Sequence, residues 1–151
     1  MNAKREPIPF ETEKIGKAIL DAAFIVHSAL GPGLLESVYE TCLAYELRQS
    51  GLQAKTQVPF PIFYGDMKLE AGMRIDLLVQ DLVIVEIKAV ESLQPVHEAQ
   101  LLTYLKVSQK RLGFLLNFNV HRLKDGIKRM VIKCTHISFP LCASCPSSPL
   151  C

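Results

Sequence analysis

The 151-residue sequence contains no apolar run close to the roughly 18 residues that a membrane-spanning helix needs. Its most apolar helical segment, AILDAAFIVHSAL, is interrupted by Asp21 and His27. The first ten residues, MNAKREPIPF, lack the apolar segment of a secretory signal. We therefore expect a chain without a membrane segment, located in the cytoplasm, whose cysteines are reduced.

Net charge is also small, at +2, but it is unevenly distributed. Residues 1–103 hold 9 Lys+Arg and 14 Asp+Glu, whereas residues 104–133 hold 8 Lys+Arg and one acid. A chain polarised in this way can offer a basic surface to nucleic acid. The alternative is a set of solvated side chains on a helix and a strand, and composition alone favours that alternative.

The chain has no internal repeat, and its length suits one domain with a hydrophobic core. Hydrophobic residues make up 49% and charged residues 21%, as in folded globular proteins. After Lys133 the composition changes to Cys, Ser and Pro without periodicity. We expect a domain over residues 1–133 and a tail over residues 134–151 that is outside the core.

Hydrophobic periodicity predicts two helices, separated by Gly31-Pro32-Gly33, and then a sheet with a third helix inserted. The order ααβββαβ, with a final strand, predicts a mixed α/β sheet flanked by helices. The expected helices cover residues 11–30, 34–50 and 95–110, and the expected strands cover residues 58–64, 68–79, 82–90, 111–120 and 127–133.

Three charged residues, Asp76, Glu86 and Lys88, lie among apolar residues of the stretch RIDLLVQDLVIVEIKAV. Charged side chains are rarely buried unless they are paired. Glu86 and Lys88 are two apart in a strand, so they share one face of the sheet. The alternate positions Val83, Val85 and Ile87 face the other way and can fill a core.

The connection between these strands decides whether Asp76 joins Glu86. In an antiparallel pair, the residue numbers of all cross-strand partners add up to the same value. Asp76 and Glu86 share a face only as such partners, which requires a sum of 162. A two-residue turn at Gln80-Asp81 would give 161 and put Asp76 on the opposite face. We therefore predict a loop with an odd number of residues, or a bulge.

Two carboxylates placed together repel each other unless a proton or a cation intervenes. Mg²⁺, or similarly Mn²⁺, is bound by oxygen ligands, commonly one or two carboxylates with waters and phosphate oxygens. Lys88 would then orient or deprotonate a water, or stabilise charge on a phosphate. This assembly suits hydrolysis of a phosphodiester. The alternative is a structural ion pair on a half-solvated sheet face.

Residues 33–39, GLLESVY, match the pattern G-x-x-E-x-x-Y. Together with Asp76…Glu86-x-Lys88 and the segment PVHEAQLLTYL, they make the chain resemble the GxxExxY family, a branch of the PD-(D/E)XK nuclease superfamily with RecB-like members. The resemblance runs from about residue 11 to residue 133.

The resemblance implies a restriction-endonuclease-like αβββαβ core with an extra N-terminal helix. It implies that Asp76 and Glu86 are metal ligands, that Lys88 is the catalytic lysine, and that Glu36 is an additional acid at the site. Glu36 also suits the start of a helix, where a negative charge is favourable.

The helix over residues 95–110 carries Gln100 and Tyr104 on one face. They match the Q-x-x-x-Y motif that RecB-like nucleases place after E-x-K, and the resemblance implies that they orient the catalytic residues and contact nucleic acid. The alternative is an amphipathic helix whose polar side happens to hold Gln and Tyr. His27 lies on the apolar face of the first helix. A core role is the simpler interpretation of His27, and a metal-ligand role is the alternative.

Cysteines gather in the tail, and Cys42 precedes the motifs. Cys42 with Cys142, Cys145 and Cys151 resembles the iron–sulfur arrangement of some RecB-like nucleases. The family match ends before these three tail residues, and Cys42 fits an apolar packing role. We favour a chain without such a cluster.

The leading hypothesis is a nuclease, dependent on Mg²⁺ or Mn²⁺, that cuts DNA or RNA and contacts phosphates through residues 104–133. The alternatives are a non-catalytic nucleic-acid-binding module, or a nuclease-fold partner in a repair or defence complex. Because the chain has no recognisable DNA-reading module, a homodimer or a larger complex with a helicase would supply specificity.

Overall fold

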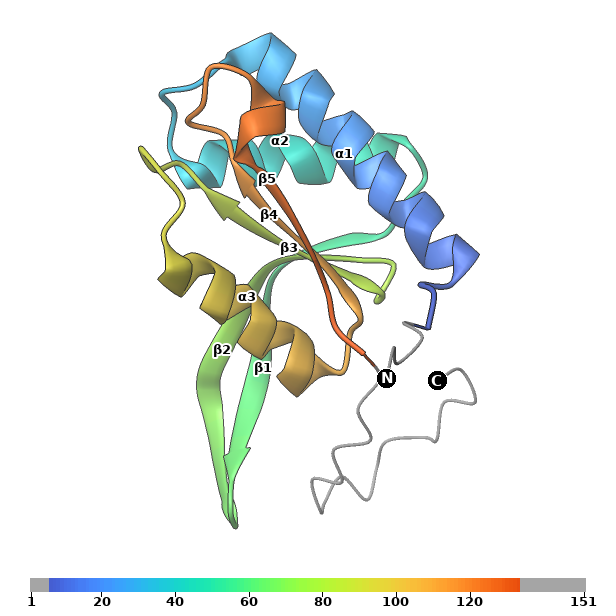
Figure 1. The fold of residues 1–151 in the computed structure, drawn as a ribbon, viewed down its shortest axis with the longest axis vertical. Coiled ribbons are helices and arrows are strands. Elements are labelled where there is room, and N and C mark those ends of the chain that lie inside the picture. Colours follow the sequence, from blue (N-terminus) through green and yellow to red (C-terminus); the bar gives the residue numbers. More distant parts are fainter. Residues whose placement is uncertain (1–5, 134–151) are drawn as a thin grey trace, which may run out of the picture.

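The computed structural model of the chain describes residues 6–133, which form one sheet with helices on both faces (Figure 1). The element order matches the predicted order ααβββαβ with a final strand. The helices are α1 (Phe10–Leu30), α2 (Glu36–Gln49) and α3 (Pro95–Ser108), with a short 3₁₀ turn, η1 (Leu123–Gly126). The strands are β1 (Ala54–Tyr64), β2 (Met67–Val79), β3 (Val83–Lys88), β4 (Leu112–Asn117) and β5 (Ile127–Val131).

The sheet has five strands in the order β1-β2-β3-β4-β5. Among the strands of residues 6–133, only β3 and β4 are parallel, and α3 makes the crossover between them. The other neighbouring strands are antiparallel. The predicted mixed α/β sheet, with a restriction-endonuclease-like core and an added N-terminal helix, is therefore confirmed.

The connection between β2 and β3 has three residues, 80–82. Leu77 pairs with Val85 and Val79 pairs with Val83, so partner numbers sum to 162. Gln80 and Asp81 both have positive φ, 52° and 56°. The Leu82 amide donates to the Val79 carbonyl across the loop at 3.0 Å. The predicted odd-numbered loop is confirmed, and it puts Asp76 in register with Glu86.

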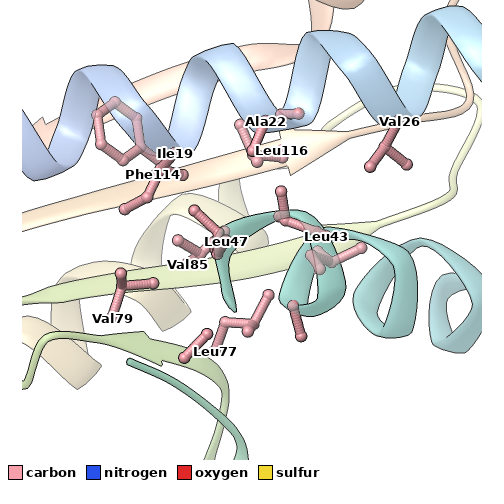
Figure 2. Packing of buried hydrophobic residues seen from close by; sticks show 14 of the residues in the cluster. Ile19, Ala22, Val26, Leu43, Leu47, Leu77, Val79, Val85, Phe114 and Leu116 are labelled. Carbon is pink, nitrogen blue, oxygen red and sulfur yellow. The ribbon is translucent and has the colours of Figure 1, made fainter. Parts of the chain in front are cut away.

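One face of the sheet packs against α1 and α2. Val83, Val85 and Ile87 of β3 point into this layer, as the strand alternation predicted. In Figure 2, Ile19 of α1 lies next to Phe114 of β4, and Leu47 of α2 lies next to Val85 of β3. This layer is mostly apolar and holds most of the large buried side chains.

The opposite face is covered by α3, through a second apolar cluster. Ile84, on the same face of β3 as Glu86, packs there with Leu101 and Leu105 of α3. The half-solvated face considered from the sequence is therefore not what the structure shows at Glu86, which is only 2% exposed. Glu86 is therefore buried on the face of the sheet that α3 covers.

Candidate active site

The backbone ladder between β2 and β3 ends at the pair Leu77 and Val85. Beyond that pair, side-chain carboxylates accept the hydrogen bonds of backbone amides. Asp76 Oδ2 accepts a hydrogen bond from the Ile87 amide at 2.9 Å. Glu86 Oε1 accepts one from the Asp76 amide at 3.3 Å. The two acids therefore replace backbone pairing between separating strands, which brings them together as the sequence predicted.

Glu86 is held in an environment that disfavours its charge. Burial, and then the neighbouring Asp76 carboxylate, raise the pKa of Glu86 to about 8, although its bond from the Asp76 amide and the nearby Lys88 ammonium act in the opposite direction. At neutral pH this carboxyl needs a proton or a cation next to it. Perturbed groups of this kind are common at functional sites.

Lys88 is the last residue of β3 and is half-buried. Its carbonyl accepts a hydrogen bond from the Phe118 amide at 2.9 Å, which fixes the strand end. None of the ion pairs within residues 6–133 involves Lys88. The ammonium lies beside Glu86 without being neutralised by a salt bridge in the described part of the chain.

The G-x-x-E-x-x-Y segment also has a structural role. Its tyrosine, Tyr39, holds the turn before α2 in place, and we call this arrangement the clasp. Tyr39 is fully buried and stacks on Phe118, with ring centroids 4.5 Å apart. Its hydroxyl donates to the Gly31 carbonyl at 2.6 Å and accepts from the Leu34 amide at 3.1 Å. Gly33, with φ 103°, has a conformation that side chains rarely adopt. The tyrosine thus holds the turn that starts α2.

That clasp fixes the position of Glu36, the first residue of α2. Glu36 Oε1 accepts a hydrogen bond from the Ala89 amide at 3.2 Å, one residue after Lys88. The acid therefore connects the start of α2 to the end of β3. Glu36 and Asp76 line one pocket of about 530 Å³, which places Glu36 near the paired acids.

The same pocket contains two residues that sequence reasoning missed, Glu40 and Gln57. Gln57 Nε2 contacts Glu40 Oε2 at 2.7 Å and Asp76 Oδ1 at 3.4 Å. Burial raises the pKa of Glu40; the Gln57 hydrogen bond opposes this, whereas Asp76 and Glu36 add to it. Glu40 was detectable, because it lies four residues after Glu36 on the same helical face. No sequence signal indicates Gln57.

Gln100 and Tyr104 lie on α3, and the Gln100 amide donates to the Tyr104 hydroxyl at 2.8 Å. Tyr104 packs against the apolar cluster under α3, the cluster that includes Ile84 of β3. The pair therefore lies on the face of the sheet that carries Glu86. Within residues 6–133, no hydrogen bond connects it to Asp76, Glu86 or Lys88.

His27 and Cys42 lie in the layer between helices and sheet. His27 is buried, and its Nε2 hydrogen-bonds the Val120 carbonyl at 2.9 Å. Cys42 is partly buried and packs against the main core cluster. These environments fit the core roles considered from the sequence. Cys142, Cys145 and Cys151 lie outside the described residues.

Many cations of residues 104–133 have partners within the protein. Lys128 and Arg129 of β5 leave opposite faces of the sheet, and β4 separates both from β3. The Arg111 guanidinium donates to the carbonyls of Glu6 and Pro7. The basic segment therefore does not form one continuous free surface beside the acids. The ion pairs in it are Lys110–Asp81, Arg122–Asp125, Lys128–Glu98 and Arg129–Glu13.

The carboxylates of the site are the type of ligand that Mg²⁺ prefers, although they do not form a complete set of ligands by themselves. In residues 6–133, no three His, Cys, Asp or Glu side chains converge as a ready-made ligand set. Asp76 and Glu86 nevertheless form a neighbouring carboxylate pair in which one charge is disfavoured. Mg²⁺ is commonly held by one or two carboxylates with waters completing its shell. The pair suits that mode of binding.

Strands that separate around an Asp and an E-x-K pair, with a further acid at the start of α2, are typical of a restriction-endonuclease-like fold. The family model for the PD-(D/E)XK nuclease superfamily matches residues 13–130. The chain belongs to this superfamily. A comparison with proteins of curated function finds no match.

The chain is also similar to the crystal structure of SSO0001, with a TM-score of 0.51 and 20% sequence identity. The match covers 83% of this chain and 61% of SSO0001, so the chain spans less than two thirds of that protein. This likeness supports the fold. Among the described residues, no helix combines the length and the hydropathy needed to cross a membrane.

Proposed function

We propose that the protein is a metal-dependent nuclease of the GxxExxY type that hydrolyses phosphodiester bonds in DNA or RNA. The observation that carries the proposal is the pairing of Asp76 and Glu86 where β2 and β3 separate, with Lys88 two residues after Glu86 and near enough to lower the pKa of Glu86. A structural ion pair would neutralise Lys88, and none of the described salt bridges does so.

In this proposal Asp76 and Glu86 hold Mg²⁺ or Mn²⁺, and Glu36 assists from the start of α2. When bound, such an ion lowers the pKa of a water and neutralises charge that develops on the phosphate. Lys88 would orient the attacking water as an ammonium, or accept the proton of that water as a neutral amine. Burial and the neighbouring Asp76 carboxylate favour the neutral form of Glu86, so this carboxyl would lose its proton when it holds the ion.

Gln100 and Tyr104 are supporting residues, whose mutual hydrogen bond would keep the polar face of α3 in one arrangement. The proposal includes a nucleic-acid substrate bound partly by cations of residues 104–133. Lys106 and Lys124 are exposed and are in none of the described ion pairs. It also includes a cytoplasmic location, and a homodimer or a larger nuclease or helicase complex that supplies specificity.

The experiment is cleavage of supercoiled plasmid and of single-stranded DNA and RNA, with Mg²⁺ or Mn²⁺, with and without chelator. Lys88→Met should abolish cleavage while thermal unfolding and nucleic-acid binding stay close to those of the unaltered protein. Lys14→Met is the matched control, because Lys14 is exposed on α1, away from the site.

Two outcomes would contradict the proposal. Cleavage by Lys88→Met at the unaltered rate would remove Lys88 from the mechanism. Salt-sensitive binding with no cleavage by the unaltered chain, under any of these conditions, would favour the non-catalytic binding module instead.

A further inference from the structure

Gln57 has an unusual backbone conformation in the middle of β1. Its φ is 52°, in the left-handed region that residues other than glycine rarely occupy. Its neighbours pair normally with β2, Thr56 with Leu77 and Val58 with Ile75. Gln57 itself stands opposite Asp76 without a ladder pair. A strained residue between two normally paired neighbours requires contacts that hold it there.

The side chain of Gln57 makes those contacts. Its amide nitrogen carries two protons, and it contacts two different carboxylates, Glu40 Oε2 at 2.7 Å and Asp76 Oδ1 at 3.4 Å. A regular strand conformation would direct the side chain elsewhere. The left-handed backbone thus aims one amide between a carboxylate of α2 and a carboxylate of β2.

The consequence falls on Asp76. Its Oδ2 is held by the Ile87 amide and its Oδ1 by Gln57, so both oxygens have a donor and the carboxylate plane is fixed. Without the amide, Glu40 and Asp76 would face each other as like charges across the pocket. The amides of Ile87 and Gln57 hold the two oxygens, and the Gln57 amide also separates the like charges of Glu40 and Asp76. Together these contacts determine where the Asp76 oxygens point.

We propose that Gln57 is a positioning residue for the ion-binding carboxylate of Asp76, and that Glu40 serves as its anchor. The inference rests on the proposed function, because Asp76 is assigned there as an ion ligand. Partners that orient a ligand side chain typically change metal affinity by about 10- to 100-fold when they are removed. That range sets the size of the effect expected here.

The main test is Gln57→Gly, which removes the amide and also relieves the positive φ. The readouts are Mn²⁺ affinity by titration calorimetry, the thermal unfolding midpoint without metal, and cleavage. We expect Mn²⁺ affinity to fall about 10-fold or more, while the unfolding midpoint stays the same or rises. A residue with a merely structural role would not separate these two measurements.

Gln109→Gly is the matched control. Gln109 follows α3 with φ 58°, so glycine relieves the same backbone conformation away from the pocket. This variant should keep or gain thermal stability and should leave Mn²⁺ affinity and cleavage unchanged. A loss of Mn²⁺ affinity in both variants would overturn the assignment to Gln57.

A second pair of variants tests the anchor. Glu40→Gln keeps a side-chain oxygen that can accept from Gln57, whereas Glu40→Ala removes it. We expect Glu40→Ala to weaken Mn²⁺ binding about as much as Gln57→Gly, and Glu40→Gln to weaken it much less. Equal losses would mean that the charge of Glu40 matters rather than its bond to Gln57, which would contradict the anchoring role.

Failure of this inference is distinguishable from failure of the proposed function. If the unaltered chain binds Mn²⁺ but cleaves nothing, and Gln57→Gly weakens that binding, the positioning role stands and the nuclease activity does not. If the unaltered chain cleaves nucleic acid and Gln57→Gly matches it in affinity and rate, the positioning role is overturned. Absence of any Mn²⁺ binding by the unaltered chain overturns it as well.

Discussion

The two ends of the β2–β3 pair have opposite structures. At the hairpin end, residues 77–79 and 83–85 form a regular ladder whose side chains are almost completely buried and apolar. One residue further, at Asp76 and Glu86, the ladder stops and carboxylates accept the backbone hydrogen bonds. The same two strands thus form a regular ladder, the frame, at one end, and an opening that holds the carboxylates of Asp76 and Glu86 at the other.

The difference shows how a small chain can place charges inside a sheet. Where the strands separate, the amides of Asp76 and Ile87 each donate to a carboxylate, so the opening leaves fewer unpaired buried donors. The regular end then sets which side chains face the opening, because register fixes the face of every residue. The frame and the site are therefore coupled through the three-residue loop.

Deleting Asp81 should break this coupling and have the largest effect. A two-residue connection would shift the register by one and move either Asp76 out of the site or Leu77 and Val79 out of the core. We expect complete loss of cleavage and destabilisation of more than about 4 kcal/mol. Denaturant unfolding and plasmid cleavage are the measurements.

Asp81→Gly is the control for loop length. It keeps three residues, and glycine suits the positive φ of 56°. Its ion pair with Lys110, at 3.6 Å, is largely exposed on the aspartate side and contributes little. The glycine variant should fold and cleave normally. A deletion variant that also did so would show that the register does not control the site.

Periodicity and strand alternation were sufficient to predict the frame. Helix and strand order depends on local patterns, and the alternation of Val83, Val85 and Ile87 correctly assigned one buried face. The loop length followed from requiring two acids to share a face. Each of these inferences uses spacing within a few residues, which a sequence displays directly.

The surroundings of the acids could not be predicted in the same way. Glu86 is buried on the face of the sheet that α3 covers, and Gln57 enters the site through a backbone conformation that spacing does not encode. The dispersal of the basic segment depends on β5 sending Lys128 and Arg129 to opposite faces. Such features arise from packing between distant segments.

The pH dependence of stability should sharpen the contrast between the two ends. The pKa of Glu86 is about 8 in the folded protein and close to 4.5 when unfolded. Between these values the folded state keeps a proton that the unfolded state has lost, so stability falls as pH rises through this range. The slope is at most about 1.4 kcal/mol per pH unit for metal-free protein.

Glu86→Gln should remove that slope, because a neutral amide has no proton to lose. The variant should be more stable than the unaltered chain at pH 8, should lose cleavage, and should bind Mn²⁺ weakly. Glu11→Gln, an exposed acid of α1, should leave the pH profile unchanged. Denaturant unfolding from pH 5 to 8 measures these curves, and parallel slopes for all three proteins would contradict the assignment.

Tyr39→Phe should have the smallest effect and tests the clasp that links the apolar layer to the site. The ring can keep its stacking on Phe118, while the Gly31 carbonyl and the Leu34 amide lose their hydroxyl partner. We expect a loss of about 1 kcal/mol in stability. Cleavage should slow modestly, because the turn that fixes Glu36 loosens.

Tyr45→Phe is the matched control for this change. Tyr45 lies on the same helix, is 57% exposed, and its hydroxyl is in none of the hydrogen bonds found within residues 6–133. It should therefore change neither stability nor cleavage. If Tyr39→Phe loses stability but cleaves at the unaltered rate, the tyrosine supports only the apolar layer, and the position of Glu36 does not depend on the clasp.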